Sequence, residues 1–430
     1  MKFEKIIQFV IWIFFSVLVG CTKQSNDIGP TVVNPIPSPP AAVDFTVTEY
    51  APVSVSKTNK TPLFAHYMPW FESPEYAQYG NSAFGNWGAH WTMGNRNPTI
   101  VDQVTGQRQI ASYFYPLVGP YDNGEPDYLE YVVSIMKLSG IDGVMIATPV
   151  ITKVNDAKLM HDHTEALLPW LSKAGLKFSI VYEDVVLKLA LEQKIITSIT
   201  SEGKNVLNYM QQNYFSKDNY FKIGNQPVLL NFGPQSLLTD QNWNDVFADM
   251  TTKPLLITLP NNIQGRSLTT SASGEFCWGA TTLLESFYQN TSKYKVTIGG
   301  AIPGFKDYYQ AGGWGTGYTS IDFLNGDRFL QTLQFASTHR VDAIQLITWN
   351  DYGEGTVIEP TAEYGYKYLN QIQSFAGLIN PSNDLAIAVE LYQKRKKNKG
   401  NTLANKKLDQ VFYYIVSLQL DKARTLLNTI

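Results

Sequence analysis

GVMIAT, residues 143–148, is a short run of small and apolar residues that follows a stretch of helical spacing at Tyr128–Leu138. A short run that contains β-branched residues and follows a helical stretch is typical of a buried parallel strand in a βαβ unit. Seven further runs of this kind occur along the chain: residues 63–68, 178–183, 227–232, 255–259, 275–279, 296–302 and 343–349. Eight strands are the number that a closed barrel needs, so the sequence predicts an α/β fold, the (β/α)8 TIM barrel.

Length and composition fit one large domain. The chain has 430 residues, of which 44% are apolar, and α/β barrels commonly fill this length as a single domain. Helices are also expected at Glu165–Lys173, Leu237–Met250 and Asp327–Thr338, between the predicted strands. The connection between the first two strands is unusually long, and such loops are usually functional. We expect the barrel domain to occupy residues 46–380.

The last fifty residues have a different sequence pattern from the barrel region. Asp384–Lys397 and Leu403–Asn428 have the spacing of two amphipathic helices, and the basic run Lys394–Lys397 lies at the end of the first. A basic run at a helix end is usually solvated, and it favours the negative pole of the helix dipole. Residues 381–430 are therefore predicted to form a C-terminal helical appendage, for which the sequence indicates no function.

The first twenty residues have the pattern of an export signal. Lys2 and Lys5 precede a largely apolar stretch, residues 6–20, which is too short to span a membrane comfortably. The stretch ends in LVGC, residues 18–21, which resembles the lipobox of bacterial lipoproteins. In those proteins the cysteine thiol receives a diacylglyceryl group and becomes the first residue after cleavage. The alternative is an ordinary secretory signal, because Gly20 is small enough for either peptidase.

The lipobox reading implies an anchor at the bacterial cell envelope, on the outer membrane or the cell surface. Residues 21–45 are rich in proline and carry few charges, so we expect an extended tether that starts at the lipidated Cys21. The membrane would then be a partner only through the lipid. Cys277 is the one other cysteine, which excludes a disulfide within the mature chain.

Charge and motifs exclude several classes of function. The 34 basic and 37 acidic residues give a net charge of −3, whereas a nucleic-acid-binding protein needs a strongly basic face. GGWGTG, residues 312–317, lacks the Lys-Ser/Thr that follows the glycines of a phosphate loop. His161 and His163 cannot both face one site on a helix, and no third metal ligand stands out. The sequence therefore predicts no cofactor, no metal site and no nucleic-acid partner.

Carboxylates stand at several predicted strand ends, where barrel enzymes place their active sites. Glu183 follows the third strand, Asp307 the seventh, and Asp351 and Glu354 the eighth. Glycoside hydrolysis needs this convergence, because one carboxyl protonates the leaving oxygen and another activates a nucleophile. The alternative for Asp307 is a local turn role, because Asp is common in Pro-Gly turns.

Asp351 and Glu354 are the best candidates for the catalytic pair. They lie three residues apart in a loop with glycines at positions 353 and 355, and glycine permits the tight backbone that would direct both carboxylates into one cleft. Two close carboxyls under aromatic cover should differ in pKa, so that one is protonated and one ionised. The alternative is that both are solvated loop acids.

Polar and aromatic residues near the predicted strand ends are candidates for substrate binding, together with Glu183 and Asp307. Aromatic faces suit sugar rings, although core burial is the usual role of any single Trp and a packed structural His is common. The candidates are Tyr67, Trp70, His90, Trp91, Trp278, Trp349 and Asn350.

Five motifs, in four regions of the chain, carry a resemblance to known families. WNDYGE, residues 349–354, resembles the strand-eight signature of glycoside hydrolase family 71, the fungal α-1,3-glucanases. GTVIEP, residues 355–360, is similar to the continuation in family 99, the endo-α-mannosidases and endo-α-mannanases. HYMPWF, residues 66–71, WGAHW, residues 87–91, and PGFKD, residues 303–307, also resemble this group. The similarity extends from Pro62 to Ser374 and implies a glycoside hydrolase barrel.

The family 99 pattern has Glu-x-x-Glu where this chain has Asp351 and Glu354. There, the first carboxylate deprotonates the sugar 2-hydroxyl and the second is the general acid and then the general base, so the resemblance implies that Glu354 is the acid. The Asp351 side chain is one methylene shorter than that of Glu, so its carboxylate lies more than about an ångström farther back. This difference favours the family 71 arrangement, which contains Asp. Gly353 stands where family 99 has His. Glu183 matches a substrate-contacting Glu of that family.

Three hypotheses follow from the sequence. The first is an endo-acting α-glycosidase, anchored at a bacterial envelope, that cleaves an α-glucan or an α-mannan. The second is a non-catalytic glycan-binding surface lipoprotein on the same barrel. The third is a carbohydrate-active barrel with lyase or transferase chemistry. The pair Asp351 and Glu354 favours the first, because a binding protein needs no proton donor.

Overall fold

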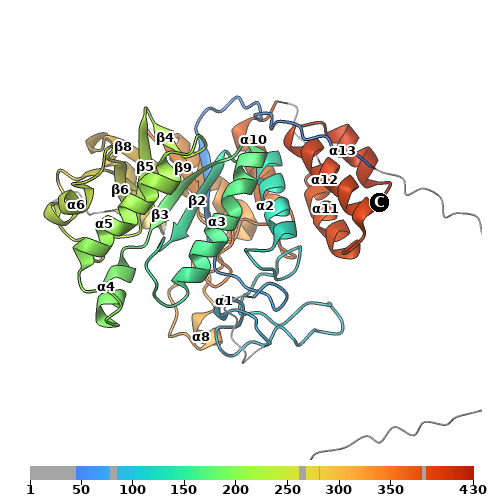
Figure 1. Ribbon diagram of the computed structural model, residues 1–430, viewed down its shortest axis with the longest axis horizontal. Helices are drawn as coiled ribbons and strands as arrows, with labels where there is room; N and C mark the ends of the chain where they lie inside the picture. The colour runs from blue at the N-terminus through green and yellow to red at the C-terminus, as the bar shows by residue number, and fades with distance from the viewer. Residues whose placement is uncertain (1–44, 78–84, 261–267, 280, 380–383) are drawn as a thin grey trace, which may run out of the picture. The chain divides into compact units, whose positions relative to one another are not determined.

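The structure is a computed structural model that describes residues 45–77, 85–260, 268–279, 281–379 and 384–430 (Figure 1). Residues from Asp44 to Ile430 form one compact unit. The predicted signal peptide, the lipidation site Cys21 and the tether as far as residue 44 lie outside the described residues, so these remain predictions.

Eight parallel strands within the described residues form a closed barrel. Along the sheet the order is β1-β2-β3-β5-β6-β7-β8-β9, and β9 pairs again with β1. The strands are β1 (Leu63–Tyr67), β2 (Gly143–Thr148), β3 (Lys177–Tyr182), β5 (Gln226–Asn231), β6 (Leu255–Thr258), β7 (Ala272–Phe276), β8 (Val296–Ala301) and β9 (Ala343–Leu346). A short antiparallel strand, β4 (Lys222–Ile223), pairs with β5. The predicted TIM barrel is confirmed, and each of the eight predicted strands overlaps an observed one.

Several predicted strands extend beyond the observed ones at their carboxyl ends. The last was predicted over residues 343–349, but β9 ends at Leu346. The residues after it are as apolar and buried as the strand itself, so composition does not mark the point where ladder pairing stops. They form the start of the loop that carries Asp351 and Glu354.

Helices follow most of the strands and cover the outside of the barrel (Figure 1). They are α2 (Pro126–Leu138), α3 (Ala157–Ala174), α4 (Val185–Glu192), α5 (Ile199–Met210), α6 (Asp240–Phe247), α7 (Thr281–Tyr288), α9 (Asp327–Ser337) and α10 (Lys367–Ala376). Two short helices, α1 (Ala89–Thr92) and α8 (Tyr309–Gly312), lie in the loops instead (Figure 1). The predicted helix at 237–250 begins later than expected, because Thr239 caps α6 with a reciprocal pair of hydrogen bonds to Asn242.

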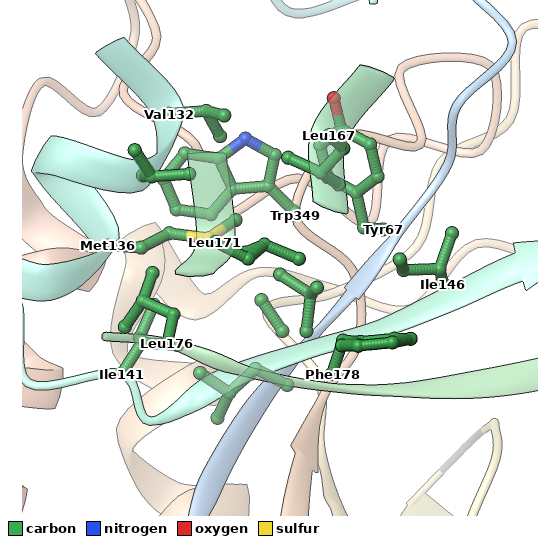
Figure 2. Packing of buried hydrophobic residues seen from close by; sticks show 14 of the residues in the cluster. Tyr67, Val132, Met136, Ile141, Ile146, Leu167, Leu171, Leu176, Phe178 and Trp349 are labelled. Atoms are coloured by element: carbon green, nitrogen blue, oxygen red, sulfur yellow. The ribbon is translucent and has the colours of Figure 1, made fainter. Parts of the chain in front are cut away.

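The side chains of the strands divide the core into two layers, because successive residues point to opposite faces of a sheet. One layer fills the barrel and includes Phe64, Met145, Val181, Leu230, Ile257, Phe276 and Ile298. The other lies between the barrel and its helices. Figure 2 shows Tyr67 and Trp349 in this outer layer, with Val132 and Met136 of α2 and Leu167 of α3.

The C-terminal appendage consists of three helices, α11 (Ala386–Lys397), α12 (Thr402–Val416) and α13 (Leu420–Leu427). The first two pack against α2 (Figure 1). The helical appendage is confirmed, but the prediction of one continuous helix over Leu403–Asn428 is wrong. The chain breaks at residues 417–419, where Leu418 has a left-handed φ of 58° that an α-helix cannot contain.

The basic run at the end of α11 is only partly solvated, in contrast to the prediction. Arg395 is buried, and its guanidinium donates two hydrogen bonds to the buried Glu130 of α2, at 2.9 Å and 2.7 Å. The same group donates to Asp409 of α12 at 2.6 Å. Lys396 forms an ion pair with the buried Glu125. These contacts attach the appendage to the barrel through charge as well as apolar packing.

Within the described residues, none of the helices combines the length and the apolar character that crossing a bilayer would require.

Replacing Arg395 with alanine should lower the free energy of unfolding by about 3–5 kcal/mol, because Glu130 would keep a buried charge without its cation. Urea denaturation of the purified protein measures this value. Lys397→Ala, an exposed position on the same helix, is the matched control and should change stability by less than about 0.5 kcal/mol. Equal stability of the two variants would contradict the proposed role of the buried pair.

Candidate active site

The loop after β9 is closed by hydrogen bonds across its base. The Thr348 N–H donates to the Thr356 carbonyl at 2.5 Å, and the Ile358 N–H donates to the Thr348 carbonyl at 3.0 Å. The tip is also held, because the carbonyls of Gly353 and Glu354 accept hydrogen bonds from the segment that follows β8. The backbone that carries the predicted catalytic pair is thus fixed at both its base and its tip.

Asp351 and Glu354 lie together in this loop. The Glu354 N–H donates to Asp351 Oδ1 at 3.0 Å, and the Asp351 N–H donates to Thr348 Oγ1 at 2.8 Å. Asp351 is only 4% exposed, whereas Glu354 is half-buried. The Tyr309 hydroxyl of α8 donates to Glu354 Oε1 at 2.9 Å. Neither residue is a freely solvated loop acid.

Burial favours the neutral form of both carboxyls. It raises the pKa of Asp351 well above its ordinary value, and the neighbouring Glu354 and Glu183 raise it further. Burial also raises the pKa of Glu354, an effect that the hydrogen bond from Tyr309 opposes. Two close carboxyls ionise together only at an electrostatic cost, so the charge of Glu354 adds to the effect of burial on the pKa of Asp351. Both pKa values are raised, and the more deeply buried Asp351 is the more strongly perturbed of the two.

Glu183, at the end of β3, is a third carboxyl of this site. Burial raises its pKa to about 7, and the charge of Asp156 adds to the effect. The Oδ2 atom of Asp156 in turn lies 3.1 Å from Nε2 of His90, within hydrogen-bond distance. The fold therefore brings the ends of β3 and β9 to one acidic cluster, as the positions of these residues in the sequence predicted.

Asp307 has a structural role at the rim. Its Oδ1 accepts the Tyr309 N–H at 3.1 Å, and its Oδ2 accepts the Tyr318 N–H at 2.6 Å. This is the local turn role that the sequence left open. Since both oxygens are engaged by the backbone, substrate contact by Asp307 has no support from this geometry.

Aromatic side chains border the acidic cluster. The rings of Trp70 and His90 stack with centroids 4.2 Å apart, and Trp314 approaches His90 edge-on at 5.5 Å. Trp278 and Glu354 line a pocket of about 240 Å³, together with residues that follow β8. Trp70, His90 and Trp278 are half-buried, so each retains surface that a ligand could contact.

Four predicted substrate-binding residues have no exposed surface in this structure: Tyr67, Trp91, Trp349 and Asn350. None of the four offers surface to a ligand in this structure, so their contact with a substrate stays a prediction without geometric support. Tyr67 and Trp349 point outward to the helices (Figure 2). Alternation along β1 explains this for Tyr67, whereas Trp349 lies beyond the end of β9. The Trp91 indole donates to the Tyr121 carbonyl at 2.8 Å. The Asn350 side chain bonds both the N–H and the carbonyl of Met68, at 2.9 Å each.

The sequence did not single out two features of the site. Tyr309, the hydrogen-bond partner of Glu354, lies in a segment whose only sequence signal was the motif that ends at Asp307. Behind the loop, the buried Glu359 accepts hydrogen bonds from Tyr121 at 2.8 Å, Tyr352 at 2.9 Å and Tyr128 at 3.3 Å. Glu359 lies inside the GTVIEP motif, but nothing local indicates three tyrosine partners, two of them more than 200 residues away.

No cluster of three or more His, Cys, Asp or Glu side chains suited to a metal ion occurs in the part of the chain that the structure describes. The carboxyls of the site are held instead by hydroxyl and backbone N–H donors. The site can therefore hold and release protons with its own side chains.

Solved structures share this fold. An endo-α-mannosidase of family GH99 from Bacteroides thetaiotaomicron superposes with a TM-score of 0.52 and 17% identity, over 73% of this chain and 96% of that chain. The same enzyme in complex with bis-Tris propane gives a TM-score of 0.52, with 78% and 98% of the two chains covered. A glycoside hydrolase-like protein matches with a TM-score of 0.50 and 12% identity, over 76% and 98%.

These neighbours agree with the resemblance to the family 71 and family 99 group at the level of the fold. At such low identity the likeness extends to the barrel and not to the chemistry. No protein-family model matches the chain. No curated protein matches it by sequence either. The function must therefore be inferred from the geometry of the site.

Glu359→Gln should change how stability depends on pH. Burial raises the pKa of Glu359 from 4.5 to about 8, so the folded state binds more protons than the unfolded state between these values. The neutral form of Glu359 thus contributes stability below pH 4.5 that is lost as the pH rises through 8. The variant should lack this part of the decline.

Urea denaturation of wild type and variant at pH 5, 6, 7 and 8 measures the difference. Glu285→Gln, at an exposed position of α7, is the control and should follow the wild-type slope. A parallel decline in wild type and Glu359→Gln would show that Glu359 does not titrate in this range.

Proposed function

We propose that this protein is a glycoside hydrolase that acts within α-linked polysaccharide chains, an α-glucan or an α-mannan. The observation that carries the proposal is the pair Asp351 and Glu354, held in a closed loop at a strand end, with both pKa values raised. Two neighbouring carboxyls with raised pKa values can supply what glycosidic cleavage needs, a proton donor beside a proton acceptor.

Glu354 is the residue we assign as general acid. It is the more exposed of the pair and lines the pocket with Trp278, so its carboxyl can reach a glycosidic oxygen. In the proposed step Glu354 transfers its proton to that oxygen as the bond to the anomeric carbon breaks. Asp351 takes up the proton of the attacking hydroxyl, which is either water or the sugar's own 2-hydroxyl. In the same proposal, the half-buried Glu183 accepts a hydrogen bond from the sugar.

The preference for α-linkages and the cleavage within the chain are inferred from the structural neighbours, the motifs and the exposed aromatics. The GH99 structure with the same barrel is described as an endo-α-mannosidase. The motif that contains Asp351 and Glu354 resembles families that act on α-linkages. Exposed aromatics beside the pocket also suit a chain that continues past the cleaved bond.

Glu354→Gln should lower kcat by about 10²–10⁴-fold on the polysaccharide that the wild type cleaves, because the amide cannot donate the proton. Reducing-end release from a panel of α-glucans and α-mannans, with full-length protein in detergent, measures the loss. Glu285→Gln is the control and should retain full activity. Binding of a glycan by a folded wild type that cleaves none of the panel would favour the non-catalytic binding lipoprotein instead.

We further propose that the protein is anchored to the bacterial envelope by a lipid on Cys21. The basis is the LVGC sequence at residues 18–21, followed by a proline-rich stretch long enough to hold the barrel away from a membrane. A surface anchor would keep an enzyme for large glycans at the face where such polymers arrive.

Cys21→Ala should abolish incorporation of an alkyne-labelled fatty acid and move the protein from the membrane to the soluble fraction. Labelling of cells that express wild type or variant, followed by gel fluorescence, measures both. Cys277→Ala is the control, since that thiol is buried and should not affect labelling. Equal labelling of the Cys21 variant and the wild type would refute the anchor.

A further inference from the structure

Two exposed aromatic side chains stand close together in the loop after α8. Trp314 is 44% exposed and Tyr318 is 73% exposed. A single exposed aromatic is unremarkable, but two within five residues beside an acidic pocket form an apolar surface of the kind that marks a ligand site. The proposed function has so far given neither of them a role of its own.

The loop is rigidly built. Asp307 accepts the N–H groups of both Tyr309 and Tyr318, which ties the two ends of the loop together. Gly317, at φ 75°, leaves no room for a side chain, because a Cβ there would lie 2.6 Å from Asp307 Oδ1. The Trp314 N–H donates to the Tyr309 carbonyl at 2.8 Å. The backbone that carries the two exposed rings is therefore fixed by the loop itself.

Tyr309 connects the exposed rings to the acid. Its hydroxyl donates to Glu354 Oε1 at 2.9 Å. Its ring lies 6.5 Å from that of Trp314, in a nearly parallel arrangement, and 6.2 Å from that of Tyr318. Tyr318 also lines the pocket of about 240 Å³ that contains Glu354. A path of aromatic surface thus leads from Glu354 past Tyr318 and Trp314 to the outside.

We propose that Trp314 and Tyr318 form a stacking platform for a sugar residue beyond the one at Glu354, and that Tyr309 is a positioning residue for the acid. This inference rests on the proposed function, since it assigns part of the substrate to the same site. The ligand is a glycan of several residues, because a single sugar in the pocket would not extend to Trp314. The apolar face of a pyranose ring provides the surface that stacks on an indole.

The platform is tested first by binding, in a background that cannot turn over. Isothermal titration of Glu354→Gln with an oligosaccharide of the cleaved polymer gives the reference Kd. Adding Trp314→Ala should weaken binding on the order of tenfold, and Trp314→Phe should restore most of the loss. Trp170→Ala, on α3 where the indole packs against Phe412, is the control and should leave Kd unchanged.

The positioning role is tested by kinetics. Tyr309→Phe should lower kcat with little change in KM, because the ring that supports Trp314 remains. The hydroxyl opposes the burial that raises the pKa of Glu354, so its removal raises that pKa further. Since a general acid must be protonated, the alkaline limb of the kcat profile should move to higher pH.

The outcomes distinguish failure of the stacking platform from failure of the proposed hydrolase function. Tight binding by the Trp314→Ala variant would overturn the platform, whether or not the protein is a hydrolase. An unchanged pH profile in Tyr309→Phe would overturn the positioning role. Failure of the Glu354→Gln reference protein to bind any glycan of the panel would overturn the platform and the proposed function together.

Discussion

The pairing of β9 with β1 closes the barrel and places the loop after the last strand against the segment after the first. The Trp349 N–H donates to the His66 carbonyl at 2.6 Å, and the Asn350 side chain holds both backbone groups of Met68. These bonds are buried, so breaking one would leave a polar group without a partner, which costs about 1–3 kcal/mol. The position of Asp351 and Glu354 therefore depends on a contact between the two ends of the barrel sequence.

Acidic groups lie on both sides of this loop, and burial raises the pKa of each of them. On the side that faces the helices, Glu359 is surrounded by tyrosine hydroxyls, and one of them belongs to Tyr352, the residue directly after Asp351. On the side that faces the pocket, burial raises the pKa values of Asp351 and Glu354. Low dielectric surroundings favour neutral carboxyls in both places. The tyrosine cluster holds the loop, while Glu354 of the pair reaches the pocket.

This chain shares its barrel framework with its structural neighbours but differs from them in the residues of the loops. At 17% identity the eight-stranded framework is common to this chain and the GH99 endo-α-mannosidase. By its motifs, this chain departs from the family 99 pattern where Asp351 and Gly353 replace Glu and His. Its appendage is attached through Arg395, whose bond to Glu130 joins helices more than 200 residues apart. Framework and site thus vary separately, because barrel packing places few demands on the loops.

The sequence alone determined the barrel, its eight strands and the spacing of Asp351 and Glu354, because these follow from local hydrophobic pattern and from residues three positions apart. It did not determine which side of a strand each aromatic faces. Trp349 follows β9 as an outward residue, and only the packing of α2 against the barrel buries it. Nor did it indicate that Tyr309 would bond Glu354, or that Arg395 would be buried. Those contacts join segments distant in the chain, and only the folded backbone brings them within hydrogen-bond distance.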